Sequence, residues 1–435
     1  MSQPIEAYAL RLEVKKLSNS SCLATVIVPV AIVDTIHHQA LCSLQRTIQA
    51  PGFQRGSVPL SYIEQNFPLS VSNHLKEFLF NFFVLSFLYK ELRHQKILIT
   101  GEPRLHEVHV QAHQDATFTF EVNMFSNLDI QEWKHLPFKA PKRKKYKDLD
   151  RQVDSFLKEE LEYLSKHTNP VADIGDWVNF DIKLVDHDGN PLLGDHVESF
   201  WFKMGDEEAD KPLRDIFIGK KVGESFNTQH SSLQAHFSDQ IDTNYNFQIT
   251  ITDILHNAYF CVEQFKKYFK LKTNKDIYQK LIEVFSYRND LSQRRSMAEE
   301  SLKLILSKHK FDIPNHVVLR QQKKVLDLVQ SNPDYHVYRM QKDFKKRIKQ
   351  LAEKQTKELL LLDQIAYLEN ISVSNQDTKQ YLNLIKRPRT KEFIYFDPPI
   401  TKLTGQEAPI SAEELKQASL REKTLNHIIY HLTKA

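Results

Sequence analysis

The chain has 435 residues, a mass of 51.0 kDa and a formal net charge of +4, from 59 basic and 55 acidic side chains. This length exceeds one ordinary hydrophobic core, so we expect roughly two to four domains. The small net charge argues against a nucleic-acid binder held by overall charge, so any electrostatic partner must be recognised locally.

Cysteine usage and apolar runs indicate the compartment. The three cysteines are widely spaced: Cys22, Cys42 and Cys261. Their number and spacing fit neither a disulfide framework nor a CxxC metal site, which favours a reducing compartment. The N-terminus lacks the apolar core of a signal peptide, and the most apolar run, at 78–92, contains an asparagine, a serine and a lysine. We interpret this run as a buried helix and expect a cytoplasmic protein without membrane contact.

Residues 1–128 are predicted to form a first α/β unit. The runs at 23–30 and 117–125 are β-branched or aromatic and of strand length. Residues 33–49 and 73–93 carry helical patterns. We therefore expect strands and helices to share one domain here.

A glycine-flanked tip, PGFQRGSVP at 51–59, lies between the two predicted helices. The chain has only ten glycines, yet Gly52 and Gly56 stand four positions apart. Between them lie an aromatic, an amide and a basic residue: Phe53, Gln54 and Arg55. Because glycines permit tight turns, we expect the tip to hold these side chains away from the backbone.

Residues 129–168 are predicted to be a linker. A basic run extends from Lys139 to Lys147. No aromatic or glycine pattern for base stacking accompanies it, which favours a solvated linker over a nucleic-acid contact. An amphipathic helix follows, with one apolar face: Val153, Phe156, Leu157, Leu161 and Leu164.

Residues 169–256 are predicted to form a small antiparallel β module. Six of the ten glycines fall within 175–223, whereas 224–404 contain none. Alternating runs begin with DWVNFDIKLVD and end with YNFQITITDIL, which is typical of an antiparallel sheet. The stretch DHDGN lacks the continuation of a calcium loop, so we interpret it as a β-turn.

Residues 257–435 are predicted to be mainly helical. Three pairs have the spacing of helix-start capping residues: Thr273 with Asp276, Ser374 with Asp377, and Ser411 with Glu414. The last helix has one apolar face: Leu425, Ile428, Ile429 and Leu432. Two interpretations stay open for this region. Its leucines either all pack inward in a closed bundle, or form an open scaffold that leaves apolar patches exposed.

No pattern for catalysis, metal binding or phosphate binding occurs in the chain. GxSxG, HExxH and glycine-rich phosphate loops are absent from the sequence. His37 and His38 are adjacent, so on a helix they would point about 100° apart and share a metal poorly. We expect no cofactor, metal or nucleotide.

Four motifs, in chain order, resemble those of trigger factor, the bacterial ribosome-associated chaperone. PGFQRGSVP resembles the docking signature GFRxGxxP, and FKMG…GKKVGESF resembles the FxxMG…GxxxGEEF of an inserted FKBP-like peptidyl-prolyl isomerase domain. FDIPNHVV resembles the opening of a chaperone-arm helix, and LREKTLNHIIYHLTKA resembles the final helix. The resemblance implies a multidomain α+β fold: an N-terminal α/β ribosome-binding domain, an inserted FKBP-like antiparallel β domain and a largely α-helical chaperone domain.

The resemblance implies that the tip docks on a ribosomal protein beside the exit tunnel, with ribosomal RNA as a further candidate contact. The matching positions are Gly52, Phe53, Gln54, Arg55, Gly56 and Pro59. Gln54 stands where the family usually has arginine, and Ser57 where lysine is common. With fewer cationic groups, we expect docking that is weaker and less salt-sensitive.

The resemblance also implies a prolyl pocket. Its positions are Ile182, Leu192, Phe200, Leu213, Phe237 and Phe247. Such a pocket needs no nucleophile, because a dry aromatic bowl lowers the cost of twisting the prolyl amide. The family favours aromatics at Ile182, Leu192 and Leu213, and a tyrosine at Phe237. We therefore expect weak or absent isomerase activity, leave prolyl-peptide binding open, and expect the module to project as an extension.

These inferences combine into a cytoplasmic, ATP-independent chaperone. It docks through 1–128 and covers nascent or unfolded polypeptides with the helices of 257–435, packed with the 129–168 helix. The resemblance also implies roles in protein export and cell division. Two alternatives stay open: a stand-alone prolyl isomerase with helical appendages, and an RNA-binding ribosome-assembly factor that uses the basic run.

Overall fold

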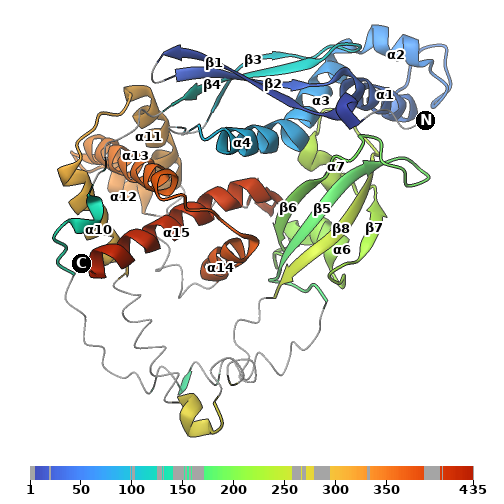
Figure 1. Ribbon diagram of the computed structural model, residues 1–435. Coiled ribbons are helices and arrows are strands. Elements are labelled where there is room, and N and C mark those ends of the chain that lie inside the picture. The colour runs from blue at the N-terminus through green and yellow to red at the C-terminus, as the bar shows by residue number, and fades with distance from the viewer. Residues whose placement is uncertain are drawn as a thin grey trace.

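Figure 1 presents the computed structural model of the protein. The structure describes residues 5–18, 21–97, 99, 103–124, 130, 132–140, 151, 154–155, 158, 171–256, 266, 271–278, 294–330, 334–386, 402–403 and 405–434. Most of the predicted basic run and the apolar face of the amphipathic linker helix lie outside these residues.

The N-terminal region contains a four-stranded antiparallel sheet in the order β1-β2-β4-β3. Its strands are β1 (Arg11–Ser18), β2 (Ser21–Val28), β3 (Arg104–His109) and β4 (Ala116–Asn123). The predicted strands at 23–30 and 117–125 are confirmed as the two central strands, whereas the charged edge strands β1 and β3 were not predicted. Every second residue of β2 is buried, so one face of the sheet covers the core.

Helices cover that buried face (Figure 1). They are the 3-10 helix η1 (Ile5–Tyr8), α1 (Val30–Thr47), α2 (Leu60–Asn66), α3 (Pro68–Leu79), the π-helix η2 (Phe80–Val84) and α4 (Leu85–His94). The predicted helix at 33–49 is α1. The predicted helix at 73–93 lies within a continuous helical path whose middle turn, η2, is widened.

The central module is built on an antiparallel sheet in the order β11-β6-β5-β8-β7. Its elements are β5 (Trp177–Val185), β6 (Glu198–Lys203), the 3-10 helix η4 (Glu208–Asp210), α6 (Lys211–Phe217), β7 (Ser225–Thr228), α7 (Ser231–Phe237) and β8 (Asn246–Leu255). The predicted turn after β5 is confirmed, with Asp186 accepting a hydrogen bond from the backbone of Asn190 at 2.8 Å. Gly205 is required by space, because an added Cβ would lie 1.9 Å from Oδ2 of Asp210.

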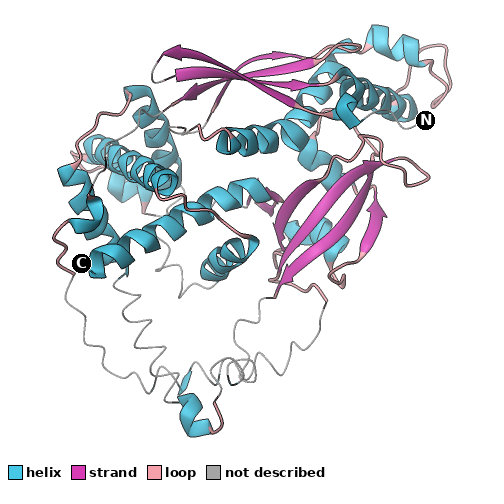
Figure 2. Cartoon of the chain, in the orientation of Figure 1, coloured by secondary structure: helices cyan, strands magenta, loops and turns pink. Residues whose placement is uncertain are grey.

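The C-terminal region is mainly helical (Figure 2). Its described elements, with one short helix from the predicted linker, are the 3-10 helix η3 (Trp133–His135), α10 (Arg294–Lys308), α11 (Asn315–Gln330), α12 (Tyr335–Arg339), α13 (Phe344–Leu368), α14 (Asn375–Lys386), β9 (Lys402–Leu403), β10 (Gln406–Glu407), β11 (Ile410–Ser411) and α15 (Ala412–Lys434). One core joins η3, α10, α13 and α15: Trp133, Leu302, Leu361, Ile365, Leu425, Ile428 and Leu432. The apolar face predicted for the last helix is therefore confirmed as its packing face.

Two of the three predicted capping pairs form as expected. Asp276 and Thr273 exchange hydrogen bonds through their side chains and backbone amides, and Asp377 and Ser374 do the same. At the start of α15, the Ser411 hydroxyl accepts a hydrogen bond from the amide of Glu413 at 3.3 Å.

The prediction that the central module projects as an extension is wrong. A single cluster of buried side chains runs from the N-terminal sheet, through α3 and η2, into the module. On the opposite side, β11 from the C-terminal region extends the module's sheet by pairing with β6. The physical reason is that the apolar helix at 78–92 has two faces to bury, and the module covers the second.

The described part of the chain was also surveyed for membrane and metal features. None of its helices combines the length and apolar character that crossing a bilayer requires. Nor does it bring three histidine, cysteine or acidic side chains together in a way that could hold a metal ion.

Candidate functional site

The glycine-flanked tip is a double turn between α1 and α2. The amide of Phe53 donates to the carbonyl of Ala50 at 3.1 Å, and the amide of Ser57 donates to the carbonyl of Gln54 at 3.0 Å. Gly52 and Gly56 adopt φ values of +87° and +84°, which side chains other than glycine rarely tolerate. The glycines therefore set the backbone of the tip.

Two anchors fix the tip to the helical layer. Val58 is fully buried, and its carbonyl accepts a hydrogen bond from Nε2 of Gln45 on α1 at 2.6 Å. Nε of Arg55 donates to the carbonyl of Arg46, also on α1, at 3.2 Å. Neither anchor from α1 was predicted, because hydrogen bonds between a loop and a preceding helix leave no periodic signal in the sequence.

The predicted contact residues face solvent. Phe53 is 40% exposed, and its ring lies 5.2 Å from that of Tyr62 on α2. Gln54 and Arg55 are exposed as well. Together they offer an aromatic face, an amide and a guanidinium, which suits a protein surface with an apolar socket beside an acidic group. Tyr62 supports the aromatic face and was not among the predicted residues.

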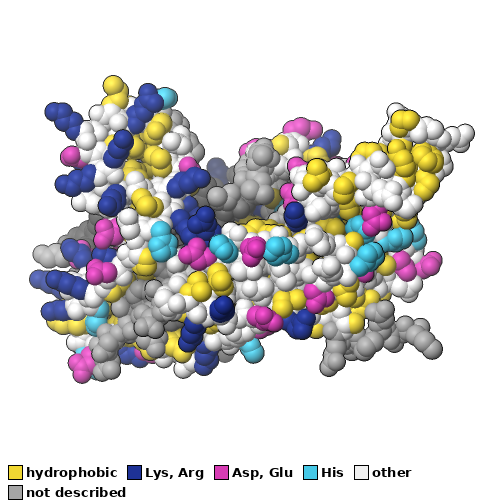
Figure 3. All heavy atoms as spheres, turned by 90° about the horizontal axis from the view of Figure 1, so that it is seen from above, with side chains coloured by type: hydrophobic (Ala, Val, Ile, Leu, Met, Phe, Trp, Pro, Cys, Tyr) yellow, Lys and Arg dark blue, Asp and Glu magenta, His cyan; other side chains and the backbone are white. Residues whose placement is uncertain are grey.

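The helical region leaves several large apolar side chains in solvent. Helices α11 and α13 pack together through a small core: Val318, Val325, Ile348 and Ala352. Outside that core, Val337 and Met340 are 66% and 83% exposed, and Leu319 and Leu351 are exposed too. Figure 3 shows hydrophobic and basic side chains interspersed over this region, on the left. Of the two interpretations left open, these individually exposed side chains favour the open scaffold for α11–α13.

The predicted prolyl pocket is closed. Ile182, Phe237 and Phe247 are fully buried, and Phe200 and Leu213 are 4% and 3% exposed. Leu192 is partly buried and packs against the same core. Five of the six predicted positions thus belong to the large buried cluster and Leu192 packs against it, while rings from the N-terminal region contact Phe237 and Phe247.

Family models match both ends of the chain. The family model described as "Bacterial trigger factor protein (TF)" matches residues 10–159, and the model "Bacterial trigger factor protein (TF) C-terminus" matches residues 273–429. Together they match more than half of the chain.

Curated relatives match over almost the whole length. The trigger factor of Geotalea daltonii is 21% identical over 95% of this chain and 95% of its own. The trigger factor of Rickettsia prowazekii is 23% identical over 93% of this chain and 90% of its own, and that of Geobacter metallireducens is 21% identical over 87% and 89%. A solved structure described under "Promiscuous Substrate Recognition in Folding and Assembly Activities of the Trigger Factor Chaperone" covers 97% of this chain and 100% of its own, at 15% identity and a TM-score of 0.37.

The family models, the domain order and the full-length relatives define the class of the protein: a ribosome-associated chaperone that assists the folding of nascent chains. More particularly, the chain belongs to the trigger factor family.

Proposed function

We propose that the chain docks on the ribosome through its tip, with Phe53 and Arg55 as the main contacts and a protein at the tunnel exit as the partner. The observation that carries this proposal is the exposure of both side chains on a rigid double turn. A rigid loop loses little conformational entropy on binding, so its contacts contribute more to affinity. The site of action is then the cytoplasm, where nascent chains emerge.

We further propose that α11–α13 hold the client. Exposed side chains such as Val337 and Met340 offer apolar contact to an unfolded segment, while the surrounding lysines and arginines keep the surface hydrated. Such contacts are individually weak, so the client is released without nucleotide hydrolysis. The proposed division of labour follows the predicted boundaries: docking by 1–128, a linker at 129–168, the β module at 169–256 and client binding by 257–435.

Ribosome co-sedimentation tests the docking proposal. We expect the double variant Phe53→Ala, Arg55→Ala to pellet with ribosomes at least about tenfold more weakly than the wild type, because an aromatic anchor and a charged contact are both removed. The matched control is Leu69→Ala, which truncates a side chain that is 77% exposed elsewhere in the same region. Equal pelleting of wild type and double variant would refute docking through the tip.

The alternative of an RNA-binding assembly factor predicts another outcome of the same experiment. Binding would fall steeply with salt, would persist on naked ribosomal RNA, and would not respond to the Phe53→Ala, Arg55→Ala change.

A further inference from the structure

Two phenylalanines of the N-terminal region lie on the prolyl cluster of the module. The ring of Phe82 on η2 lies 4.8 Å from that of Phe237 and 6.2 Å from that of Phe247. The ring of Phe78 on α3 lies 5.9 Å from that of Phe237, which in turn contacts Phe200 at 5.7 Å. Three of these contacts are edge-to-face and the one between Phe82 and Phe247 is stacked, with centroid separations that aromatic pairs commonly adopt. The predicted prolyl pocket is therefore occupied by Phe78 and Phe82, two rings of the same chain.

Hydrogen bonds surround this aromatic contact. His74 on α3 is fully buried, with Nδ1 3.0 Å from the Ser238 hydroxyl and Nε2 2.5 Å from the Tyr245 hydroxyl. The Ser238 hydroxyl donates to Glu77 at 2.9 Å. One arrangement satisfies all of them: Nδ1–H of a neutral His74 donates to Ser238, and Tyr245 donates to Nε2. Burial lowers the pKa of His74 to about 4, in agreement with a neutral ring.

Polar side chains of the N-terminal region also contact the module beside the prolyl positions. Nδ2 of Asn81 donates to the carbonyl of Phe237 at 2.9 Å. On α1, the Ser43 hydroxyl lies 3.3 Å from the side-chain oxygen of Asn244. The interface therefore combines a dry aromatic centre with satisfied polar groups at its margin, as stable protein interfaces do.

The π-helix explains how one helix serves two partners. Its widened turn lets the neighbouring side chains Phe82 and Phe83 both face the module, where Phe83 lies 5.4 Å from the ring of His196. Phe80 faces the other way, with its ring 6.3 Å from Phe118 and 6.2 Å from Phe120 on β4. The η2 turn presents aromatic rings on two sides because it lies between a sheet and the module.

The outer side of the module is held by the C-terminal region. Trp177 and Trp201 of the module's sheet pack with α14, β11 and α15 in one cluster that contains Tyr381, Leu382, Ile410 and Leu415. Residues Ile410–Ser411 (β11) pair with β6. The module is thus bonded on two sides, to regions that come before it and after it in the chain.

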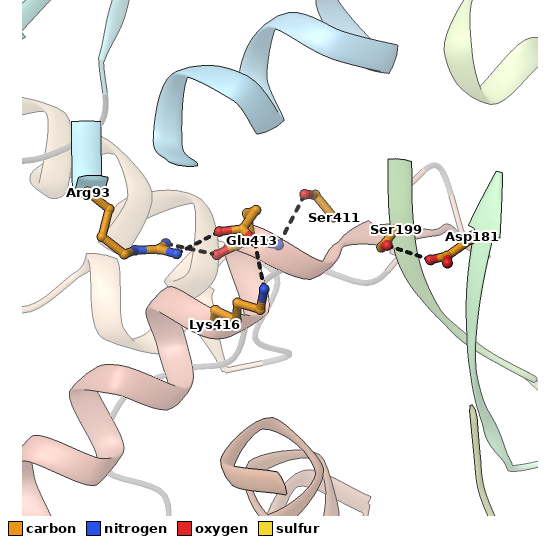
Figure 4. A network of polar contacts seen from close by, with 6 residues as sticks. All are labelled: Arg93, Asp181, Ser199, Ser411, Glu413 and Lys416. Carbon is orange, nitrogen blue, oxygen red and sulfur yellow. Dashed lines mark hydrogen bonds and ion pairs between the residues drawn. The ribbon is translucent and has the colours of Figure 1, made fainter. Parts of the chain in front are cut away.

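An ion-pair network connects the N-terminal and C-terminal regions directly (Figure 4). Arg93 near the end of α4 donates to the carboxylate of Glu413 at 2.6 Å, and Lys416 pairs with the same carboxylate at 2.8 Å. These charges hold the pKa of Glu413 below its usual value against the effect of burial. The three regions therefore contact one another in a closed triangle.

We propose that the prolyl cluster is a docking site for the chain's own α3–η2 helix, and that the module acts as a clamp between the two outer domains. A prolyl substrate would have to displace the ring of Phe82 and break the hydrogen bonds of His74 and Asn81. The clamp predicts that the full chain neither binds nor isomerises prolyl peptides through this module.

The first experiment uses the full chain and an Ala-Phe-Pro-Phe peptide as the probe. Cis–trans exchange of the peptide is followed by NMR, and amide hydrogen exchange across 231–247 is measured in wild type, Phe82→Ala and Phe80→Ala. Phe80→Ala is the matched control, because the same truncation on the same helix faces β4 instead of the module.

We expect wild type and Phe80→Ala to leave peptide isomerisation at its uncatalysed rate. Phe82→Ala should speed hydrogen exchange across 231–247 at least tenfold more than Phe80→Ala does. Catalysis of the peptide by the wild type, or equal exchange effects of the two variants, would overturn the proposal.

If Phe82→Ala fails to fold, a disulfide cross-link between the N-terminal region and the module tests the proposal instead. Ser43→Cys with Asn244→Cys, in a Cys42→Ser background, joins the N-terminal region to the module where their side chains already touch. Oxidised and reduced samples of this variant are compared for suppression of aggregation of denatured citrate synthase. If the module stays bound between the outer domains, the oxidised and reduced samples should suppress aggregation equally, within about twofold. A loss of more than tenfold on oxidation would show that the module must separate from the N-terminal region, and would overturn the proposal.

Discussion

The tip and the prolyl cluster differ in what surrounds them. Both contain phenylalanines at positions that resemble family binding sites, yet Phe53 is 40% exposed whereas Phe237 is fully buried. Glycine turns hold the first away from the body of the protein, and a neighbouring helix covers the second. A resemblance between residues therefore identifies a surface that can bind, while packing decides whether an external partner can reach it.

The largest expected effect on stability comes from truncating Phe82, which covers the prolyl cluster. Phe82→Ala should lower the free energy of unfolding by about 3–5 kcal/mol, because it leaves a cavity among rings that are almost fully buried. Urea unfolding monitored by circular dichroism measures this change. Phe53→Ala supplies the comparison and should cost less than about 1 kcal/mol, since its ring is already partly hydrated. Similar losses for both variants would remove the distinction between the two regions.

The pH dependence of stability tests the buried histidine at the interface. The pKa of His74 is lowered to about 4 in the folded protein, below its ordinary value of 6.5. The unfolded chain therefore binds the proton more readily, so the stabilisation is present above pH 6.5 and is lost as the pH falls towards 4. The loss should reach about 3 kcal/mol for this group.

His74→Gln removes this titration and should flatten that part of the pH profile. Two other buried groups have strongly shifted pKa values: burial also lowers the pKa of His236 to about 4, and it raises the pKa of Glu198 to about 7. Both remain in the variant, so the difference between the two profiles isolates His74. Parallel profiles of wild type and variant between pH 4 and 6.5 would contradict the assignment.

A smaller effect is expected at the tip. Gln54→Arg adds a guanidinium beside Arg55, which should tighten ribosome binding by up to about fivefold at low salt and make it more salt-dependent. Leu69→Arg adds the same charge at an exposed position elsewhere in the same region and serves as the control. Co-sedimentation across a salt series measures both variants, and identical slopes would show that charge at the tip does not contribute.

The sequence predicts local structure better than contacts between regions. Runs of β-branched and aromatic residues identify the central strands β2 and β4, and paired glycines locate the tip. The edge strand β1 escapes prediction because its many charged residues give it a low β-propensity. Strand β11, only Ile410–Ser411, is too short to carry any period.

The sequence does not predict that the apolar helix at 78–92 packs against the central module. The run at 78–92 correctly indicates a buried helix, but hydrophobic burial is non-directional and does not say which surfaces meet. The same limit applies to the prolyl positions. Their apolar character was predicted from the sequence, whereas their occupation by Phe82 depends on contacts between segments more than a hundred residues apart.

The contrast between an accessible tip and a covered prolyl cluster is tested most directly by amide hydrogen exchange. It is measured by mass spectrometry on the free and the ribosome-bound protein. The account predicts that amides of 50–59 exchange more slowly on ribosomes, while 74–84 and 231–247 are strongly protected in both states. Unchanged exchange at 50–59, or rapid exchange across 74–84 and 231–247 in either state, would contradict it.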